Sequence, residues 1–185
     1  LSKLNSLVKD VDASYANYDP TNAARQIENF VIDNLSNWYV RLCRRRFWKG
    51  DYTEDKIAAY QKLYTCLETI ALLSSPIAPF YSDKLFCDLN SITKKNSANS
   101  VHLADFPQVN EKHIDIDLEQ RMALAQRVSS MVLSLRKKDN LRVRQPLQKI
   151  MIPVSNDVVE RQLKAVSDLI LSEVNVKEME LVSAN

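Results

Sequence analysis

Residues 34–49 read NLSNWYVRLCRRRFWK, and the fold of the chain is best inferred outward from this stretch. Apolar side chains recur through it, and through the residues before it, at the spacing of one helix face. They are Ala24, Ile27, Val31, Leu35, Trp38 and Leu42. The pattern predicts a helix from about residue 22 to residue 49 that packs this stripe against other helices. Gly50, the only glycine of the chain, follows where a left-handed helix end is favourable.

The C-terminal end of this predicted helix is basic and aromatic. It contains Arg41, Arg44, Arg45, Arg46 and Lys49, with Trp38 and Trp48 on either side. Helical spacing places Arg41, Arg45 and Trp48 along one flank of the apolar stripe. Arginine forks match phosphate geometry and a tryptophan ring offers a stacking face, so this end is a candidate polyanion-binding surface. The alternative is a solvated helix end whose arginines pair with acidic residues of a neighbour, with Trp38 in the core.

Composition excludes several classes of site. The net charge of the 185 residues is +2, so affinity for nucleic acid would have to come from a local patch. One glycine excludes the glycine-rich loops that hold nucleotide phosphates. The three cysteines are too far apart for a zinc or redox motif and indicate a reducing, cytoplasmic compartment. The two histidines, His102 and His113, lack partners at ligand spacing, so we expect no metal site and no catalytic group.

The remaining patterns predict a mainly α chain. Helices are expected at about 2–18, 53–75, 81–89 and 115–138, and a loop and extended segment at 91–113. A strand, a helix and a strand follow at 149–154, 156–171 and 174–182. We therefore predict a helical bundle over residues 1–140 and a small β-α-β unit, truncated at its C-terminus, over 141–185. No apolar run approaches the ~20 residues of a membrane span. The chain starts at Leu1 without a methionine, so a piece of a longer protein is expected.

A second basic cluster precedes the β-α-β unit. It consists of Arg136, Lys137, Lys138, Arg142 and Arg144. Side chains alternate from Leu141 to Arg144, which predicts an extended segment with both of its arginines on one side. The cluster either adds to a polyanion-binding face or holds the bundle against the β-α-β unit through salt bridges.

These motifs resemble a known family. The blocks are NWYVRLCRRRFW, AYQKLYTCLETIALLSSPIAPFYSDKLF, SVHLADFPQV, LRKKDNLRVRQPLQKIMIPV and ILSEVNVKEMEL. In this order and over almost the whole chain, they are similar to class I aminoacyl-tRNA synthetases, specifically isoleucyl-tRNA synthetases beyond their catalytic core. The resemblance implies the anticodon-binding helical bundle and the start of a C-terminal α/β extension.

The resemblance also implies a function. The whole enzyme, a ligase of protein biosynthesis, uses ATP and Mg²⁺ to attach isoleucine to its tRNA. The HIGH and KMSKS signatures are absent here, so the fragment itself is expected to lack catalytic residues and cofactors and to position the anticodon stem and loop. The expected tRNA-binding residues are Arg41, Arg44, Arg45, Arg46, Trp48, Lys49, Arg142, Arg144 and Gln145. Its other expected partner is the catalytic domain of the same chain, and a monomer without membrane association is expected.

A structural or protein-docking helical domain is the alternative. Such a domain would expose an apolar patch around residues 1–11 or at the kink of residues 76–81. A free-standing enzyme has no residue set to support it.

Overall fold

The structure is a computed structural model that describes residues 1–48 and 50–183. It divides into two compact units, Leu1–Ile114 and Asp115–Asn185. The predicted boundary after residue 140 differs from this division. The difference is helix α6 (Ile116–Lys138), which packs against the helices of the C-terminal unit and therefore belongs with them. The mainly α fold with a small C-terminal β-α-β unit is confirmed.

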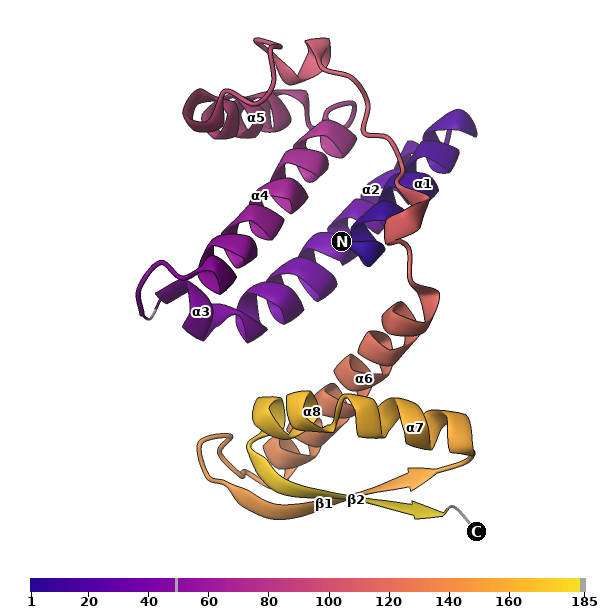
Figure 1. The fold of residues 1–185 in the computed structure, drawn as a ribbon. Helices are drawn as coiled ribbons and strands as arrows, with labels where there is room; N and C mark the ends of the chain where they lie inside the picture. Colours follow the sequence, from indigo (N-terminus) through magenta and orange to yellow (C-terminus); the bar gives the residue numbers. More distant parts are fainter. Residues whose placement is uncertain (49, 184–185) are drawn as a thin grey trace. The chain divides into compact units, whose positions relative to one another are not determined.

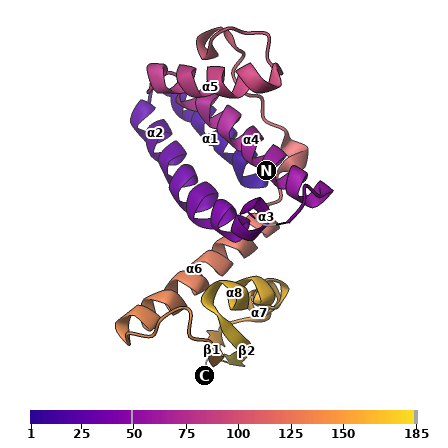
Figure 2. The same ribbon diagram turned by 90° about the vertical axis from the view of Figure 1, so that its left-hand side faces the viewer.

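Three helices contribute most of the main core of the first unit. Helices α1 (Ser2–Ala16), α2 (Pro20–Asn29) and α4 (Glu54–Ser74) pack against one another, and α5 (Pro79–Thr93) crosses the end of α4 (Figures 1 and 2). Their shared core contains leucine, valine and isoleucine side chains from all three segments: Leu4, Leu7, Val11, Ile27, Ile70 and Leu73. The antiparallel helices predicted from the apolar periodicity are therefore present.

Side-chain caps fix where these helices begin. The Asp19 carboxylate accepts from the Asn22 N–H at 2.9 Å, and Pro20 occupies the first turn of α2. The Thr53 hydroxyl accepts from the Lys56 N–H at 3.3 Å at the start of α4, within the helix predicted at 53–75. The chain turns between α4 and α5, at the kink expected there. Helix α5 begins at Pro79, two residues before the predicted start, because proline suits the first turn of a helix.

The predicted helix over residues 22–49 is divided into three. After α2, residues Phe30–Val40 form a π-helix, and α3 (Arg44–Trp48) follows. A π-helix bonds each N–H to the carbonyl five residues back, so residues five apart share a face. Phe30 and Leu35, five apart, are both buried. The α-helical wheel used for the sequence therefore does not hold through residues 30–40.

One carboxylate anchors the chain that follows α5. The Asp83 Oδ1 atom accepts from the Ser100 hydroxyl at 2.7 Å and from the Val101 N–H at 2.9 Å. These bonds hold a 3₁₀ turn, Val101–Leu103, with Val101 buried beside Phe86. The segment predicted as loop and extended chain is therefore tied to the first unit.

The second unit is a parallel β-α-β arrangement with α6 added. Strands β1 (Leu147–Val154) and β2 (Val176–Ser183) pair in parallel, with Leu147 opposite Val176. Helices α7 (Asp157–Ala165) and α8 (Ser167–Val174) connect the strands, and α6 packs against these two helices (Figure 1). Among the described residues, no helix is long and apolar enough to cross a membrane.

Candidate nucleic-acid interface

Helix α3 is held to α4 by aromatic contacts. The buried Phe47 ring lies 5.0 Å from the Tyr60 ring, and the Tyr60 hydroxyl donates to the Phe47 carbonyl at 3.1 Å. The Tyr39 hydroxyl donates to the Ala59 carbonyl at 3.0 Å. Burial and the neighbouring Cys43 raise the pKa of Tyr39 to about 12, so this donor keeps its proton at neutral pH. These contacts fix the position of the basic end of the predicted helix relative to α4.

The opposite side of α3 is exposed and basic. Arg44 and Arg45 are exposed, and neither side chain makes a hydrogen bond or an ion pair with the described part of the chain. Trp48 is 74% exposed at the end of the same helix. Arg41 is exposed too, although it has an interaction partner within the chain. Cations and an indole ring thus share one accessible helix end.

Arg46 lies in a different environment. Its Nε donates to Asp55 Oδ2 at 2.7 Å, and its Nη2 donates to Asp55 Oδ1 at 2.5 Å and to the Asp55 carbonyl at 3.0 Å. The pairing with an acidic residue of a neighbouring helix, considered above for all the arginines, therefore occurs for Arg46. Lys49, another predicted contact, lies outside the described residues.

Tyr52 is a further exposed aromatic residue, four positions after Trp48 in the sequence. Its ring is 76% exposed. The Lys56 ammonium lies 4.6 Å from the ring centroid and donates to the Gly50 carbonyl at 3.2 Å. Lys56 is only 7% exposed, so its cation is fixed under the tyrosine. An aromatic residue directly after a basic stretch and a glycine is the sequence signal that could have identified it.

The core position considered for Trp38 is met only in part. It is half-buried in the π-helix, and its indole Nε1 is buried without a hydrogen-bond partner among the described residues. The two tryptophans of the motif therefore have different environments.

The second basic cluster contains a turn. The prediction of an extended segment is wrong, because the Gln145 N–H bonds to the Arg142 carbonyl at 3.0 Å and closes a turn. Arg142, Arg144 and Gln145 are exposed on it. Arg136, which the sequence placed in the basic cluster, is 2% exposed and donates to carbonyls of the turn. It cannot reach a polyanion.

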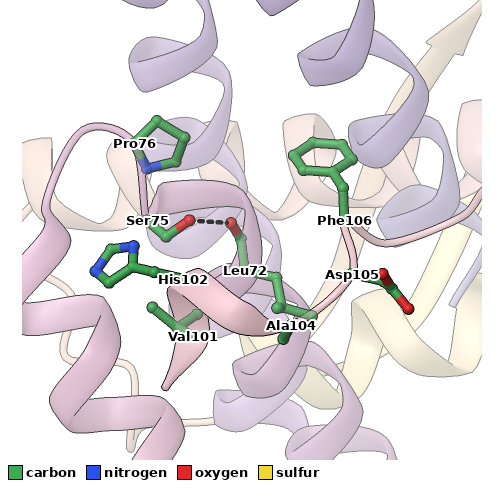
Figure 3. A pocket seen from close by; sticks show the side chains of 8 residues that line it. All are labelled: Leu72, Ser75, Pro76, Val101, His102, Ala104, Asp105 and Phe106. Atoms are coloured by element: carbon green, nitrogen blue, oxygen red, sulfur yellow. Dashed lines mark hydrogen bonds between the residues drawn. The ribbon is translucent and has the colours of Figure 1, made fainter. Parts of the chain in front are cut away.

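A hollow of about 190 Å³ at the α4–α5 corner of the first unit offers no competing active site. His102 and Asp105 lie on opposite sides of it (Figure 3). The Ser75 hydroxyl donates to the Leu72 carbonyl at 2.9 Å, as a helix-end bond (Figure 3). The remaining lining residues are Leu72, Pro76, Val101, Ala104 and Phe106, so the lining holds no nucleophile beside a base and no cluster of like charges.

Comparison with known proteins identifies the family. Residues 1–151 match the sequence family described as the anticodon-binding domain of tRNA ligase. The chain belongs to this family. Proteins named isoleucine–tRNA ligase are similar to it over 98% of its length: that of Cytophaga hutchinsonii is 61% identical, that of Bacteroides fragilis 59% and that of Bacteroides thetaiotaomicron 56%. The chain spans 16% of the length of each. The resemblance to aminoacyl-tRNA synthetases is thus confirmed.

Proposed function

We propose that this chain is the tRNA-binding part of an isoleucine–tRNA ligase and that its first contact surface is the exposed end of α3. The observation that carries the proposal is the combination of unpaired Arg44 and Arg45 with exposed Trp48. The membership in the anticodon-binding family and the names of the relatives support it. The proposed role is to hold the anticodon stem and loop of isoleucine tRNA, in the cytoplasm, as a monomer.

The residue types suggest a division of roles on this surface. Arg41, Arg44 and Arg45 supply guanidinium groups for phosphate oxygens, and Lys49 would add a further cation. Trp48 and Tyr52 supply exposed rings on which unstacked loop bases can lie. Recognition of single-stranded RNA loops uses this combination, because splayed bases expose both their faces and their edges.

The turn of the second unit is the proposed second contact. Arg142 and Arg144 would bind phosphates, and the Gln145 amide can both donate to and accept from a base edge. Arg46 is the weakest of the proposed contacts, because its guanidinium already binds Asp55.

Aminoacylation is proposed only for the longer protein, with ATP and Mg²⁺ as its cofactors and the catalytic domain as the partner of this part. The residues of this chain do not fit either cofactor. The single glycine cannot form a phosphate-binding loop, and the described residues contain no group of three or more histidine, cysteine or acidic side chains that could hold a metal ion.

Binding of the 185-residue chain to isoleucine tRNA tests the proposal. Affinity should be measured at several salt concentrations, beside a copy of the tRNA with an exchanged anticodon. With about four or five phosphate contacts, log K against log salt should slope at roughly −3 to −4.5. A preference for the native anticodon would indicate base reading, and a steep slope without preference would indicate a backbone clamp. Absence of binding at low salt would contradict the proposal.

A protein-docking role is the second candidate. It is favoured by the apolar side chains at the turn into α5, where Phe80 is 91% exposed and Tyr81 is 68% exposed. The two candidates are distinguished by the effect of Phe80→Ser with Tyr81→Ser. These changes should leave tRNA affinity unaltered if α3 is the RNA contact.

A further inference from the structure

The turn at residues 142–145 is held from inside by one arginine. The Nη2 atom of Arg136 donates to the Arg142 carbonyl at 2.9 Å, to the Val143 carbonyl at 3.2 Å and to the Gln145 carbonyl. Three carbonyls of one short turn thus converge on a single nitrogen. Because these carbonyls face inward, the backbone of the turn is fixed from its inner side, while Arg142, Arg144 and Gln145 are exposed.

The burial of the Arg136 guanidinium indicates that its role is to hold the turn at residues 142–145. The side chain is 2% exposed, and no carboxylate among the described residues pairs with it. Its Nε and Nη1 atoms are buried without a hydrogen-bond partner in the described part of the chain. A buried, uncompensated cation is unfavourable for stability compared with an apolar side chain of similar size. The benefit that offsets this cost is the geometry that the guanidinium imposes on the turn.

Asn175 holds the same turn from the other end of the β-α-β unit. Its Nδ2 donates to the Val143 carbonyl at 2.9 Å, and its own carbonyl accepts from the Leu147 N–H at 3.2 Å. Asn175 has a φ of 53° and ends α8 in the left-handed conformation that asparagine tolerates. The turn is therefore joined both to the end of α6 and to the start of β2.

We propose that Arg136 and Asn175 are positioning residues that preorganise the Arg142–Gln145 turn for the phosphate groups of an RNA loop. The proposal rests on the proposed function, because it concerns the second contact surface. A loop that is ordered in the free protein does not lose its conformational entropy on binding. The inward carbonyls fix the spacing of Arg142 and Arg144, so both guanidinium groups can meet neighbouring phosphates without rearrangement.

Asn175→Gly is the main test. Glycine keeps the left-handed backbone and removes only the amide donor. The matched control is Asn140→Gly, a second asparagine of this unit with positive φ (56°), whose side chain makes no hydrogen bond with the described residues. We expect Asn175→Gly to weaken tRNA binding about three- to ten-fold, and Asn140→Gly to leave it unchanged. Unfolding curves should show that both variants are folded at the temperature of the binding assay.

A double-mutant cycle separates positioning from general stability. In a chain that already carries Arg142→Gln and Arg144→Gln, the change Asn175→Gly should have no further effect on tRNA affinity. Arg136→Lys, which keeps the charge but loses the planar fork, should couple to the same pair in the same way. If Arg136→Lys does not fold, the coupling of Asn175→Gly to the two arginines still tests the proposal.

The outcomes separate this inference from the proposed function. If the wild-type chain does not bind tRNA, the proposed function is wrong and this inference falls with it. If the wild-type chain binds but Arg142→Gln with Arg144→Gln binds equally well, the turn is no contact and only the inference is overturned. It is overturned as well if Asn175→Gly binds like Asn140→Gly, or if its effect persists without the two arginines.

Discussion

Arg46 binds Asp55 through two parallel hydrogen bonds, Nε to Oδ2 at 2.7 Å and Nη2 to Oδ1 at 2.5 Å. This pair joins α3 to the first turn of α4, and Nη2 also reaches the Asp55 carbonyl. We expect Arg46→Gln to lower the free energy of unfolding by about 1 kcal/mol, because the pair is bidentate but partly exposed. Urea unfolding of the 185-residue chain measures this change.

Asp55→Asn is the matched control for that prediction. If the pair is the source of stability, Asp55→Asn should destabilise the chain by a similar amount, and the double variant should cost little more than either single one. Independent, additive effects would show that Arg46 and Asp55 do not act as a pair. A normal stability for Arg46→Gln with a large loss of tRNA binding would assign Arg46 to the RNA contact instead.

In contrast to Arg46, Arg44 and Arg45 should matter for tRNA binding and not for the stability of the chain. Each is exposed and has no partner in the described part of the chain, so Arg44→Gln and Arg45→Gln should change the unfolding free energy by less than about 0.5 kcal/mol. Each variant should weaken tRNA binding and make the slope of log K against log salt shallower by about 0.7 to 0.9. Salt-dependent titrations of the variants and of Arg127→Gln, an exposed arginine of α6, check this. An unchanged slope in both α3 variants would contradict the proposed surface.

Trp48 and Tyr52 should contribute through stacking. Replacing a base-stacking aromatic residue by alanine typically costs about 1 to 3 kcal/mol of binding, so Trp48→Ala and Tyr52→Ala should each weaken tRNA binding. Trp48→Phe and Tyr52→Phe keep a ring and should retain most of the affinity. The salt slope should stay unchanged in all four variants, since no phosphate contact is removed. Equal losses in the alanine and phenylalanine variants would contradict stacking.

The fold could be predicted from the sequence where local chemistry determines it. Asp19, Thr53 and Asp115 cap helices within three residues of themselves, and such caps can be read from the chain directly. The β-α-β order likewise follows from a change in the period of apolar residues. The break at Val166, which divides the helix predicted at 156–171 into α7 and α8, has no comparable local signal.

The parts of the site that the sequence did not predict depend on contacts between distant residues. Arg45 and Arg46 are neighbours with the same charge, and only the position of Asp55 on α4 separates an exposed cation from a structural one. Arg136 looked like a surface residue of a basic helix end, yet the turn six to nine residues later folds back over it. Leu135 beside it is apolar and yet 60% exposed, because α6 is rotated so that Arg136 faces inward.

Asp83 makes the stability of the first unit dependent on pH. Hydrogen bonds from the Ser100 hydroxyl and the Val101 N–H hold the pKa of this carboxyl below its usual value of 3.8. A carboxyl whose pKa is lower in the folded state stabilises that state fully above the unfolded pKa, and the effect is lost as pH falls through the folded pKa. The wild-type chain should therefore be more stable than Asp83→Ala at neutral pH, and the difference should shrink only below about pH 4.

Thermal midpoints of the two proteins from pH 7 to pH 2.5 measure this difference. The control is Asp88→Ala on the same helix, because the Asp88 carboxylate pairs with Lys84 alone among the described residues, at the surface. A difference for Asp83→Ala that stays constant down to the lowest pH would show that the carboxylate charge does not hold the turn at Val101.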